Sequence, residues 1–252
     1  MINRIFDCVF VINLDRAPDR LKRIDLHLKR LGIKYERIQA VDGKTLTKNE
    51  IRASTTKHCG MFCTKGAIGC ALSHKAAWKL AVDRRLKQFL VLEDDAHLTK
   101  DFNNRFTKIW QHVPNDWDMV YLGCTTGCGD RKDYTALDWG MTGAFMTNSF
   151  IKNKQSPKQR YVNEHICVPD SASATHAYAL TGSAAATLIS RMDKVSGFGH
   201  VDQLITYEIG RDLTKYAFVD GSIITQPLSF DDSFIGGGGS PFIGNILLDQ
   251  SN

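Results

Sequence analysis

The stretch FLVLEDD, residues 89–95, places four apolar residues directly before three carboxylates. A continuous apolar run of this kind is typical of a strand that is buried on both faces of a sheet. Because side chains alternate along a strand, Glu93 and Asp95 are expected to point one way and Asp94 the other. The stretch therefore predicts a central strand that ends in acidic side chains.

The position of these acids suggests a ligand site, because open α/β sheets bind their ligands at the carboxyl ends of the strands. Two carboxylates that face the same way repel each other unless a cation lies between them. Mg²⁺ or Mn²⁺ with a nucleotide diphosphate fits, since hard cations take oxygen ligands and share them with phosphate. A solvated acidic turn after a core strand is the alternative interpretation.

Strands and helices alternate on both sides of this stretch. Apolar runs predict strands over residues 8–14, 35–41, 88–92 and 118–122, and helical spacing predicts helices over 18–31, 66–86 and 99–113. Thr47 and Glu50 have the spacing of a capping box for a further short helix. This βαβαβ order predicts an α/β fold with a mostly parallel, Rossmann-like central sheet flanked by helices.

The second half of the chain is less regular. Strands are predicted over residues 141–147, 174–180, 216–219 and 223–228, and helices over 183–192, capped by Ser183, and over 201–211. We interpret residues 123–138, the basic stretch 152–160 and the four glycines 236–239 as loops, the glycines as a lid or linker. We expect a single domain over residues 1–252, with a regular half of about 1–125 and a less regular half of about 126–252.

The composition, 43% hydrophobic and 23% charged, is that of a soluble globular protein. A net charge of +5 suits an anionic substrate or membrane surface and is too small and scattered to indicate nucleic acid binding. Residues 1–14 resemble a first strand more than a signal peptide, because Asp7 interrupts the apolar run. No run approaches the ~18 apolar residues of a membrane span. We therefore expect a cytoplasmic protein, peripheral at most at the inner face of a membrane.

Seven cysteines, an odd number without a secretory signal, favour reduced thiols and a cytosolic setting. The pairs Cys59/Cys63 and Cys124/Cys128 could instead be halves of a zinc site, with His58 near the first pair. No matching Cys/His pair completes either half, so free thiols are the favoured interpretation.

A candidate anion site lies at the end of the first predicted strand. Asn13 and Leu14 end this strand, and Arg16 and Arg20 bracket the start of the next helix. A helix N-terminus and a guanidinium together attract phosphate or other anions. A helix cap with surface arginines is the alternative.

A second candidate lies in the predicted helix 66–86. Gly66 and Gly69 near its start are costly unless something packs close to the backbone. Ser73 and His74 lie in mid-helix, where each needs a hydrogen-bond partner when buried. They could bond to a ligand, or have a purely structural role.

Two turns in the second half could also contact a substrate. The backbone amides of Thr181-Gly182-Ser183 could meet an anion or a sugar hydroxyl. In Gly199-His200-Val201-Asp202, an acid at a helix start could be a catalytic base or merely an N-cap.

Taken together, these motifs resemble glycosyltransferase family 25, the lipopolysaccharide-type and collagen-type galactosyltransferases. The resemblance covers residues from about 8 to 230, and it rests on VINLDR (11–16) with Arg20, QAVDG (39–43), GCALSH (69–74) with Trp78, LEDD (92–95), WDMVYLG (117–123), AY (177–178) and VD (201–202). The family usually has Glu where this chain has Ala67, so any contact of that Glu is absent here.

The resemblance implies a GT-A fold, a nucleotide-sugar donor that is usually a UDP-hexose, a divalent metal (Mn²⁺ or Mg²⁺) and inversion at the anomeric carbon. It implies a glycan, lipid-linked or protein-linked acceptor, with residues 1–125 as the donor-binding half and residues 126–252 as the acceptor-side half. It assigns Asp95 and Glu93 to the metal. With the motifs above, it predicts a donor-binding set made of Asn13, Leu14, Arg16, Arg20, Val41, Asp42, Ser73, His74, Glu93 and Asp94.

The predicted function is the metal-dependent, inverting transfer of a hexose, galactose or glucose, from a UDP-sugar to a hydroxyl in glycan or lipopolysaccharide biosynthesis. Asp202 is predicted to take the proton of the acceptor hydroxyl, with His200 as the alternative base. A nucleotide-sugar hydrolase would use the same acids and release free sugar. A non-catalytic nucleotide-sugar-binding protein is the third possibility, which Ala67 favours slightly.

Overall fold

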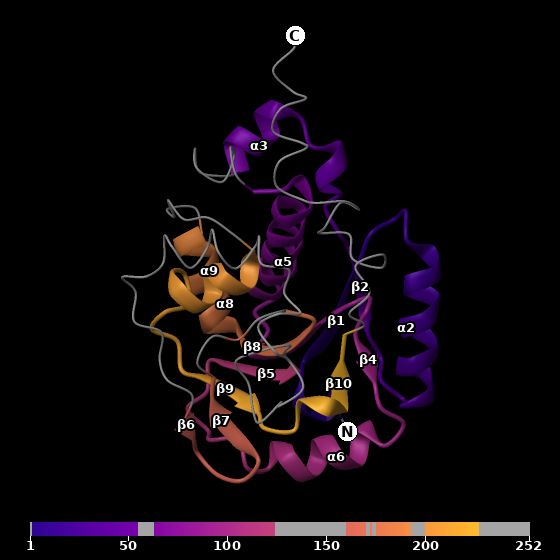
Figure 1. Ribbon diagram of the computed structural model, residues 1–252, viewed down its shortest axis with the longest axis vertical. Helices are drawn as coiled ribbons and strands as arrows, with labels where there is room; N and C mark the ends of the chain where they lie inside the picture. The colour runs from indigo at the N-terminus through magenta and orange to yellow at the C-terminus, as the bar shows by residue number, and fades with distance from the viewer. Residues whose placement is uncertain are drawn as a thin grey trace, which may run out of the picture.

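The computed structural model describes residues 2–54, 63–123, 160–169, 172, 175–192 and 200–226 (Figure 1). The strands are β1 (Cys8–Asn13), β2 (Glu36–Gln39), β3 (Gln88–Glu93), β4 (His97–Leu98), β5 (Met119–Gly123), β6 (Arg160–Tyr161), β7 (Ile166–Val168), β8 (Ala177–Thr181), β9 (Lys215–Phe218) and β10 (Ile224–Thr225). The α-helices are α1 (Ile2–Ile5), α2 (Pro18–Arg30), α3 (Lys48–Ser54), α5 (Lys65–Asp83), α6 (Phe102–Trp110), α8 (Gly182–Met192) and α9 (Val201–Tyr207). Two short 3-10 helices are η1 (Gly43–Thr45) and η2 (Gly221–Ile223).

Strands from both halves of the chain form one sheet in the order β2-β1-β3-β8-β5-β9-β7-β6. β1 is parallel to β2 and β3, and β5 is parallel to β9. β8 runs antiparallel between β3 and β5. The α/β class with a central sheet flanked by helices is thus confirmed, and the sheet is mixed because β8, β7 and β6 run antiparallel to their neighbours. An apolar run predicts that a strand is buried but not its direction, which is why β8 could not be placed from sequence.

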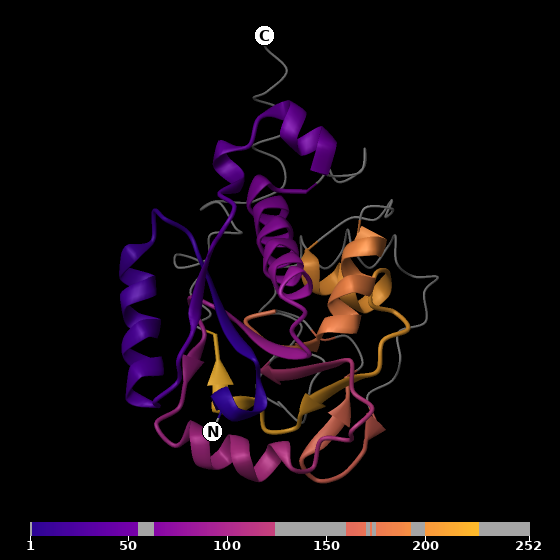
Figure 2. The same ribbon diagram turned by 180° about the vertical axis from the view of Figure 1, so that it is seen from behind.

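Alternating side chains of the central strands build two apolar layers, one on each face of the sheet. Phe10, Phe89 and Tyr178 belong to the layer that packs against α5, α8 and α9. Val11 and Leu90 belong to the layer that packs against α2 and α6. In both views α2 lies on the flank opposite α8 and α9, with α5 between them (Figures 1 and 2). The central strands are therefore covered on both faces, as the apolar run before Glu93 predicts.

Local signals set the boundaries of α2 and α3 as predicted. Pro18 is the first residue of α2, and Gly32 follows its end with φ +65°. Before α3, the backbone N–H of Thr47 donates to Glu50 Oε2 at 2.8 Å, and the N–H of Glu50 donates to Thr47 Oγ1 at 3.2 Å. The capping box is confirmed because both of its reciprocal bonds are present.

Other boundaries differ from the predictions. α8 begins at Gly182, and the backbone N–H of Ala184 donates to Thr181 Oγ1 at 3.2 Å, so Thr181 caps it and the prediction of Ser183 is wrong. β4, β6 and β7 were not predicted, because strands of two or three residues are too short to show a periodic pattern. The predictions for 124–138, 141–147, 152–159 and 236–239 concern segments outside the described residues, as do His58, Cys59, Cys124 and Cys128.

Cysteine chemistry corrects one prediction. Cys8, Cys70 and Cys167 are free thiols, as predicted, but Cys63 is disulfide-bonded. The prediction of reduced thiols is wrong for Cys63, which also removes it as a zinc ligand because only a thiolate binds the metal. Across the part of the chain that the structure describes, no helix combines the length and apolarity needed to span a membrane.

Candidate functional site

The candidate site forms where β1 and β3 end side by side. The two strands are parallel, with Ile12 opposite Glu93. The next residue on each chain therefore meets its counterpart: Asn13 Nδ2 donates to Asp94 Oδ2 at 2.7 Å. Both side chains are buried, so the carboxyl ends of the two strands are joined by a hydrogen bond in the interior.

Arg20, in the first turn of α2, places a buried cation against two members of the acidic triplet. One terminal nitrogen of its guanidinium lies 2.5 Å from Asp94 Oδ1 and 2.6 Å from Asp95 Oδ2. The cation that the sequence required between carboxylates is thus supplied by the protein, and it joins Asp94 to Asp95. The predicted pairing of Glu93 with Asp95 is not what the contacts show. β3 ends at Glu93, so the alternation of side chains does not extend to the two following residues.

Asp95 keeps one oxygen uncommitted. Gln226 Nε2 donates to Asp95 Oδ2 at 3.0 Å, whereas Asp95 Oδ1 is buried and has no hydrogen-bond partner among the described residues. Burial raises the pKa of Asp95 to about 6, and the negative charge of Glu93 also raises this pKa. The positive charge of Arg20 acts to lower it but does not outweigh the other two effects. A buried carboxylate oxygen without a partner is expected to bind something, because an unsatisfied acceptor is costly.

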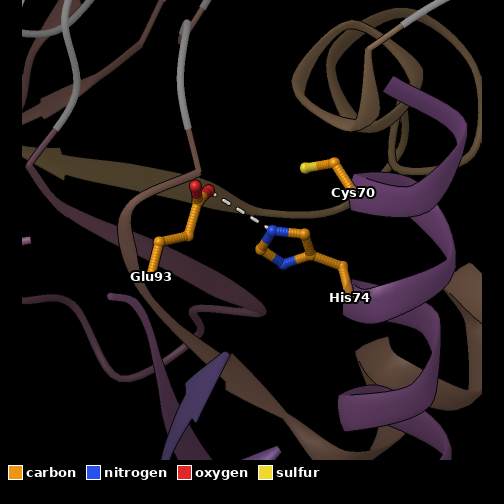
Figure 3. A group of neighbouring side chains, drawn as sticks. All are labelled: Cys70, His74 and Glu93. Atoms are coloured by element: carbon orange, nitrogen blue, oxygen red, sulfur yellow. Dashed lines mark ion pairs between the residues drawn. The ribbon is translucent and has the colours of Figure 1, made fainter. Parts of the chain in front are cut away.

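Glu93 belongs to a separate hydrogen-bond network with α5 and β8. Thr175 Oγ1 donates to Glu93 Oε1 at 2.9 Å, and His74 Nε2 lies 3.3 Å from the same oxygen (Figure 3). Burial acts to raise the pKa of Glu93, but the hydrogen bond and charge of His74 outweigh it and hold the pKa below its ordinary value. His74 Nδ1 lies 2.8 Å from the Tyr178 hydroxyl, which also accepts from Trp78 Nε1 at 2.8 Å. His74 therefore links Glu93 to the buried aromatic side chains.

The other predicted donor-side residues lie in the turn after β1, in the turn before η1 and on α5. Arg16 Nε forms an ion pair with Asp42 Oδ2 at 2.6 Å. Ser73 Oγ accepts from the backbone N–H of Val41 at 2.8 Å and donates to the Gly69 carbonyl at 2.6 Å. Ser73 thus fixes the backbone at Val41 from the neighbouring helix. Leu14 contributes its carbonyl to the turn before α2.

Gly69 shows why glycine lies near the start of α5. A Cβ at this position would come within 2.5 Å of the Val41 carbonyl oxygen and 2.7 Å of the Gly43 nitrogen. The backbone of residues 41–43 therefore packs directly on the helix, which confirms the sequence argument that something must lie close to it. Thr64 caps this helix, with the N–H of Ala67 donating to its Oγ1 at 3.1 Å. The family's Glu at position 67 would occupy the capping-box position. Ala67 cannot accept the reciprocal hydrogen bond from the backbone N–H of Thr64.

The two predicted bases lie at the start of α9. Asp202 Oδ1 accepts from the N–H of Gln203 at 2.8 Å, and His200 precedes the helix without a side-chain cap bond. Burial raises the pKa of Cys70, and the charges of Glu93, Asp202 and Asp95 add to the effect. All three carboxylates therefore lie within electrostatic reach of Cys70. That Asp202 shares a site with the acidic triplet stays a prediction.

Sequence reasoning missed Arg37, Thr175 and Gln226. Arg37 Nε donates to Asn13 Oδ1 at 2.9 Å, which orients the Asn13 amide toward Asp94. The sequence carried a partial signal for Arg37, because this residue lies inside the predicted strand 35–41, but its register opposite Val11 is known only from the structure. Thr175 and Gln226 carried no such signal, since they lie 82 and 131 residues from the acids they contact.

The family model for glycosyltransferase family 25 (LPS biosynthesis protein) matches residues 6–205. The chain belongs to this family.

Particular relatives are similar over 129 residues, 47% of this chain. Human procollagen galactosyltransferase 2 is 33% identical, Danio rerio procollagen galactosyltransferase 1 is 39% identical, and the human inactive glycosyltransferase 25 family member 3 is 36% identical. The match spans 21–22% of the length of these relatives. The solved structure of apo mouse xyloside xylosyltransferase 1 covers 81% of each chain at 8% identity, with a TM-score of 0.34 that adds nothing to the fold argument.

Proposed function

We propose that this protein transfers a hexose, galactose or glucose, from a UDP-sugar to a hydroxyl of a glycan, lipid-linked or protein-linked acceptor, with inversion at the anomeric carbon. Membership of family 25 and the similarity to two procollagen galactosyltransferases support the transferase class. The UDP-sugar, the metal and the acceptor are part of the proposal.

One observation supports this function most directly. Asp95 Oδ1 is buried without a hydrogen-bond partner among the described residues, at the carboxyl end of β3 where α/β sheets bind ligands. Arg20 holds the other oxygen of the same carboxylate. The free oxygen is therefore fixed in place before any ligand arrives.

The residues present fit a divalent metal. Asp95 Oδ1 is an oxygen donor of the kind that Mn²⁺ and Mg²⁺ prefer and would hold the ion. The carboxylate of Glu93 would be the second ligand, although its Oε1 already contacts Thr175 and His74. When bound, the ion would neutralise the charge that develops on the departing diphosphate. Arg20 cannot replace it for this purpose, because its guanidinium is already engaged with Asp94 and Asp95.

The protein side chains act around this centre. Asn13 orients Asp94, Asp94 holds Arg20 in place, and Arg20 orients Asp95. The nucleotide would contact the side chains of Arg16 and Asp42 and the backbone at Leu14 and Val41. Ser73 fixes the backbone at Val41. His74 orients Glu93.

Asp202 acts as the general base in this proposal. The acceptor oxygen forms its bond to the anomeric carbon while the bond from that carbon to the diphosphate breaks, and the hydroxyl proton moves to the Asp202 carboxylate. Such a step contributes about 10²–10⁴ in rate. Asp202→Asn should lower kcat by that factor with unchanged UDP binding, whereas the same loss in His200→Ala alone would assign the base to His200.

A product assay tests the function. The protein is incubated with UDP-galactose or UDP-glucose, Mn²⁺, and either a procollagen peptide or a lipopolysaccharide acceptor, and both UDP and sugar products are measured. Equal amounts of UDP and glycosylated acceptor would establish transfer. UDP with an equal amount of free sugar, unaffected by acceptor, would establish a hydrolase.

A non-catalytic, nucleotide-sugar-binding protein is the second candidate. The similarity to a relative named as inactive favours it, as does Ala67 at the capping-box position of α5. UDP binding by calorimetry without any UDP release in the product assay would support this candidate and exclude both enzymes.

The location belongs to the proposal as well. The free thiols of Cys8, Cys70 and Cys167 support a cytoplasmic protein, peripheral at most at the inner face of a membrane. The disulfide of Cys63 argues the other way, because disulfides are rare in the cytosol. Cell fractionation combined with thiol labelling of Cys63 decides between the two.

A further inference from the structure

A second constellation of ligand-type side chains adjoins the proposed donor site. Cys70 and His74 are four residues apart on α5 and therefore lie on one face of the helix. Glu93 faces them from the end of β3, and the three side chains point into one shared space (Figure 3). Their sulfur, nitrogen and oxygen ligand atoms all lie within 4.8 Å of one another.

The chemistry of this set differs from that of Asp95. Thiolate, imidazole and carboxylate together are the donor types that zinc takes, at about 2.0–2.3 Å from the ion, whereas Mn²⁺ and Mg²⁺ prefer oxygen alone. Cys70 is a free thiol that is only partly buried, and His74 is buried. Three protein ligands leave one tetrahedral position for water or a phosphate oxygen.

The surrounding hydrogen bonds are those expected around zinc ligands. A zinc-binding histidine usually bonds through its second ring nitrogen to a fixed partner, and its carboxylate neighbours are also hydrogen-bonded. Here His74 Nδ1 lies 2.8 Å from the Tyr178 hydroxyl, which Trp78 holds in turn. Thr175 Oγ1 donates to Glu93 Oε1 at 2.9 Å. His74 and Glu93 are thus held in place by partners outside the ligand set.

We propose that Cys70, His74 and Glu93 bind Zn²⁺, and that this ion inhibits the protein by occupying Glu93. Binding releases the thiol proton of Cys70 to solvent, so that the thiolate sulfur bonds to the metal. Glu93 belongs both to this zinc site and to the Mn²⁺ site proposed above with Asp95. Bound Zn²⁺ therefore opposes the Mn²⁺-dependent reaction. The inhibition rests on the proposed function, but the metal binding does not.

Direct binding of Co²⁺ and Zn²⁺ tests the site. Co²⁺, as a spectroscopic substitute for zinc, should produce a thiolate-to-metal charge-transfer band at one equivalent, and Zn²⁺ should abolish this band. Cys70→Ser and Cys70→Ala should lose the band and one equivalent of bound Zn²⁺ in equilibrium dialysis. Cys8→Ser is the matched control, because Cys8 is another partly buried free thiol outside the cluster, and it should bind as the wild type does.

A graded variant separates the site from adventitious thiol binding. Tyr178→Phe keeps all three ligands but removes the partner of His74, and it should weaken Zn²⁺ affinity about 10–100-fold while the band persists. The proposal is overturned if the wild type shows no thiolate band, or if both Cys70 variants retain the band and the bound Zn²⁺.

The consequence for activity is measured separately. Zn²⁺ added to the transfer assay at fixed Mn²⁺ should inhibit the wild type and the Cys8→Ser control, and it should leave the active Cys70→Ser variant unaffected. A protein that binds Zn²⁺ through Cys70 but transfers no sugar would retain the site and refute the proposed function. An active enzyme whose Cys70 variants bind Zn²⁺ normally would refute the site alone.

Discussion

Arg20 and Lys215 are both buried cations, yet they lie in opposite electrostatic settings. Arg20, 8% exposed, contacts two carboxylates at the carboxyl ends of β1 and β3. Lys215, the first residue of β9, is also 8% exposed, and its ammonium donates to the backbone carbonyl of Gly210. Burial lowers the pKa of Lys215 to about 8, although the charges of Asp212 and Asp118 oppose this shift.

The two buried cations differ in how they can compensate for the cost of burial. A buried ion pair adds little net stability but is costly to break, because removing one partner leaves the other buried and uncompensated. Arg20 therefore depends on its carboxylate partners to offset the cost of burying its charge. Lys215 can avoid that cost by losing its proton and becoming neutral. The comparison can be tested from both sides.

The largest effect is expected from Arg20→Met. This change leaves Asp94 and Asp95 buried without their cation, which should lower the free energy of unfolding by about 3–5 kcal/mol at pH 7. Urea unfolding followed by circular dichroism measures it. A loss below about 1 kcal/mol would mean that the triplet is neutralised by other means.

Lys215→Met should change how the free energy of unfolding depends on pH. Native Lys215 loses its proton near pH 8, while the unfolded chain keeps it to about 10.5, its ordinary value. Between these values the unfolded state binds more protons, so the stability due to Lys215 rises with pH, by about 3 kcal/mol across the window. Unfolding free energies of the wild type minus those of Lys215→Met, measured from pH 7 to 10.5, should show this rise. A flat difference would show that Lys215 titrates normally in the native state.

Asp95→Asn and Asp94→Asn should separate the two acids that share Arg20. We expect UDP with Mn²⁺ at ~100 times its dissociation constant to stabilise the wild type by about 2.7 kcal/mol. Asp95→Asn should lose this response, because it removes the free carboxylate oxygen, and Asp94→Asn should keep it. Thermal unfolding with and without ligand gives both values, and equal responses in the two variants would remove Asp95 from the ligand site.

The smallest effect is expected from Arg16→Gln. Its ion pair with Asp42 is partly exposed, with the Arg16 side chain 35% accessible, and pairs of this kind contribute about 0.2–1 kcal/mol. The same urea measurement serves as the control for Arg20→Met. A cost of about 3 kcal/mol or more for Arg16→Gln would abolish the distinction between exposed and buried arginines in this region.

Several site residues could be predicted because local patterns carry them. The apolar run before Glu93 predicts a buried strand, and a parallel neighbour ending at Asn13 brings that residue to the acids. The contacts of Arg20 could not be predicted in the same way. Its place in the first turn of α2 suggested an anion site, but nothing in the sequence distinguishes a nucleotide phosphate from the protein's own carboxylates.

The buried strands, the start of α2, α3 and α5, and the acids after β3 can all be read from the sequence, because these properties depend on neighbouring residues and on short spacings. The division of the acidic triplet is visible only in the folded protein, where Asp94 and Asp95 contact Arg20 and Glu93 contacts His74 and Thr175. The physical reason is that the partner of a buried charge is selected by distance in space. Thr175 and Gln226 reach the acids only after the chain has folded β8 and β10 back to them.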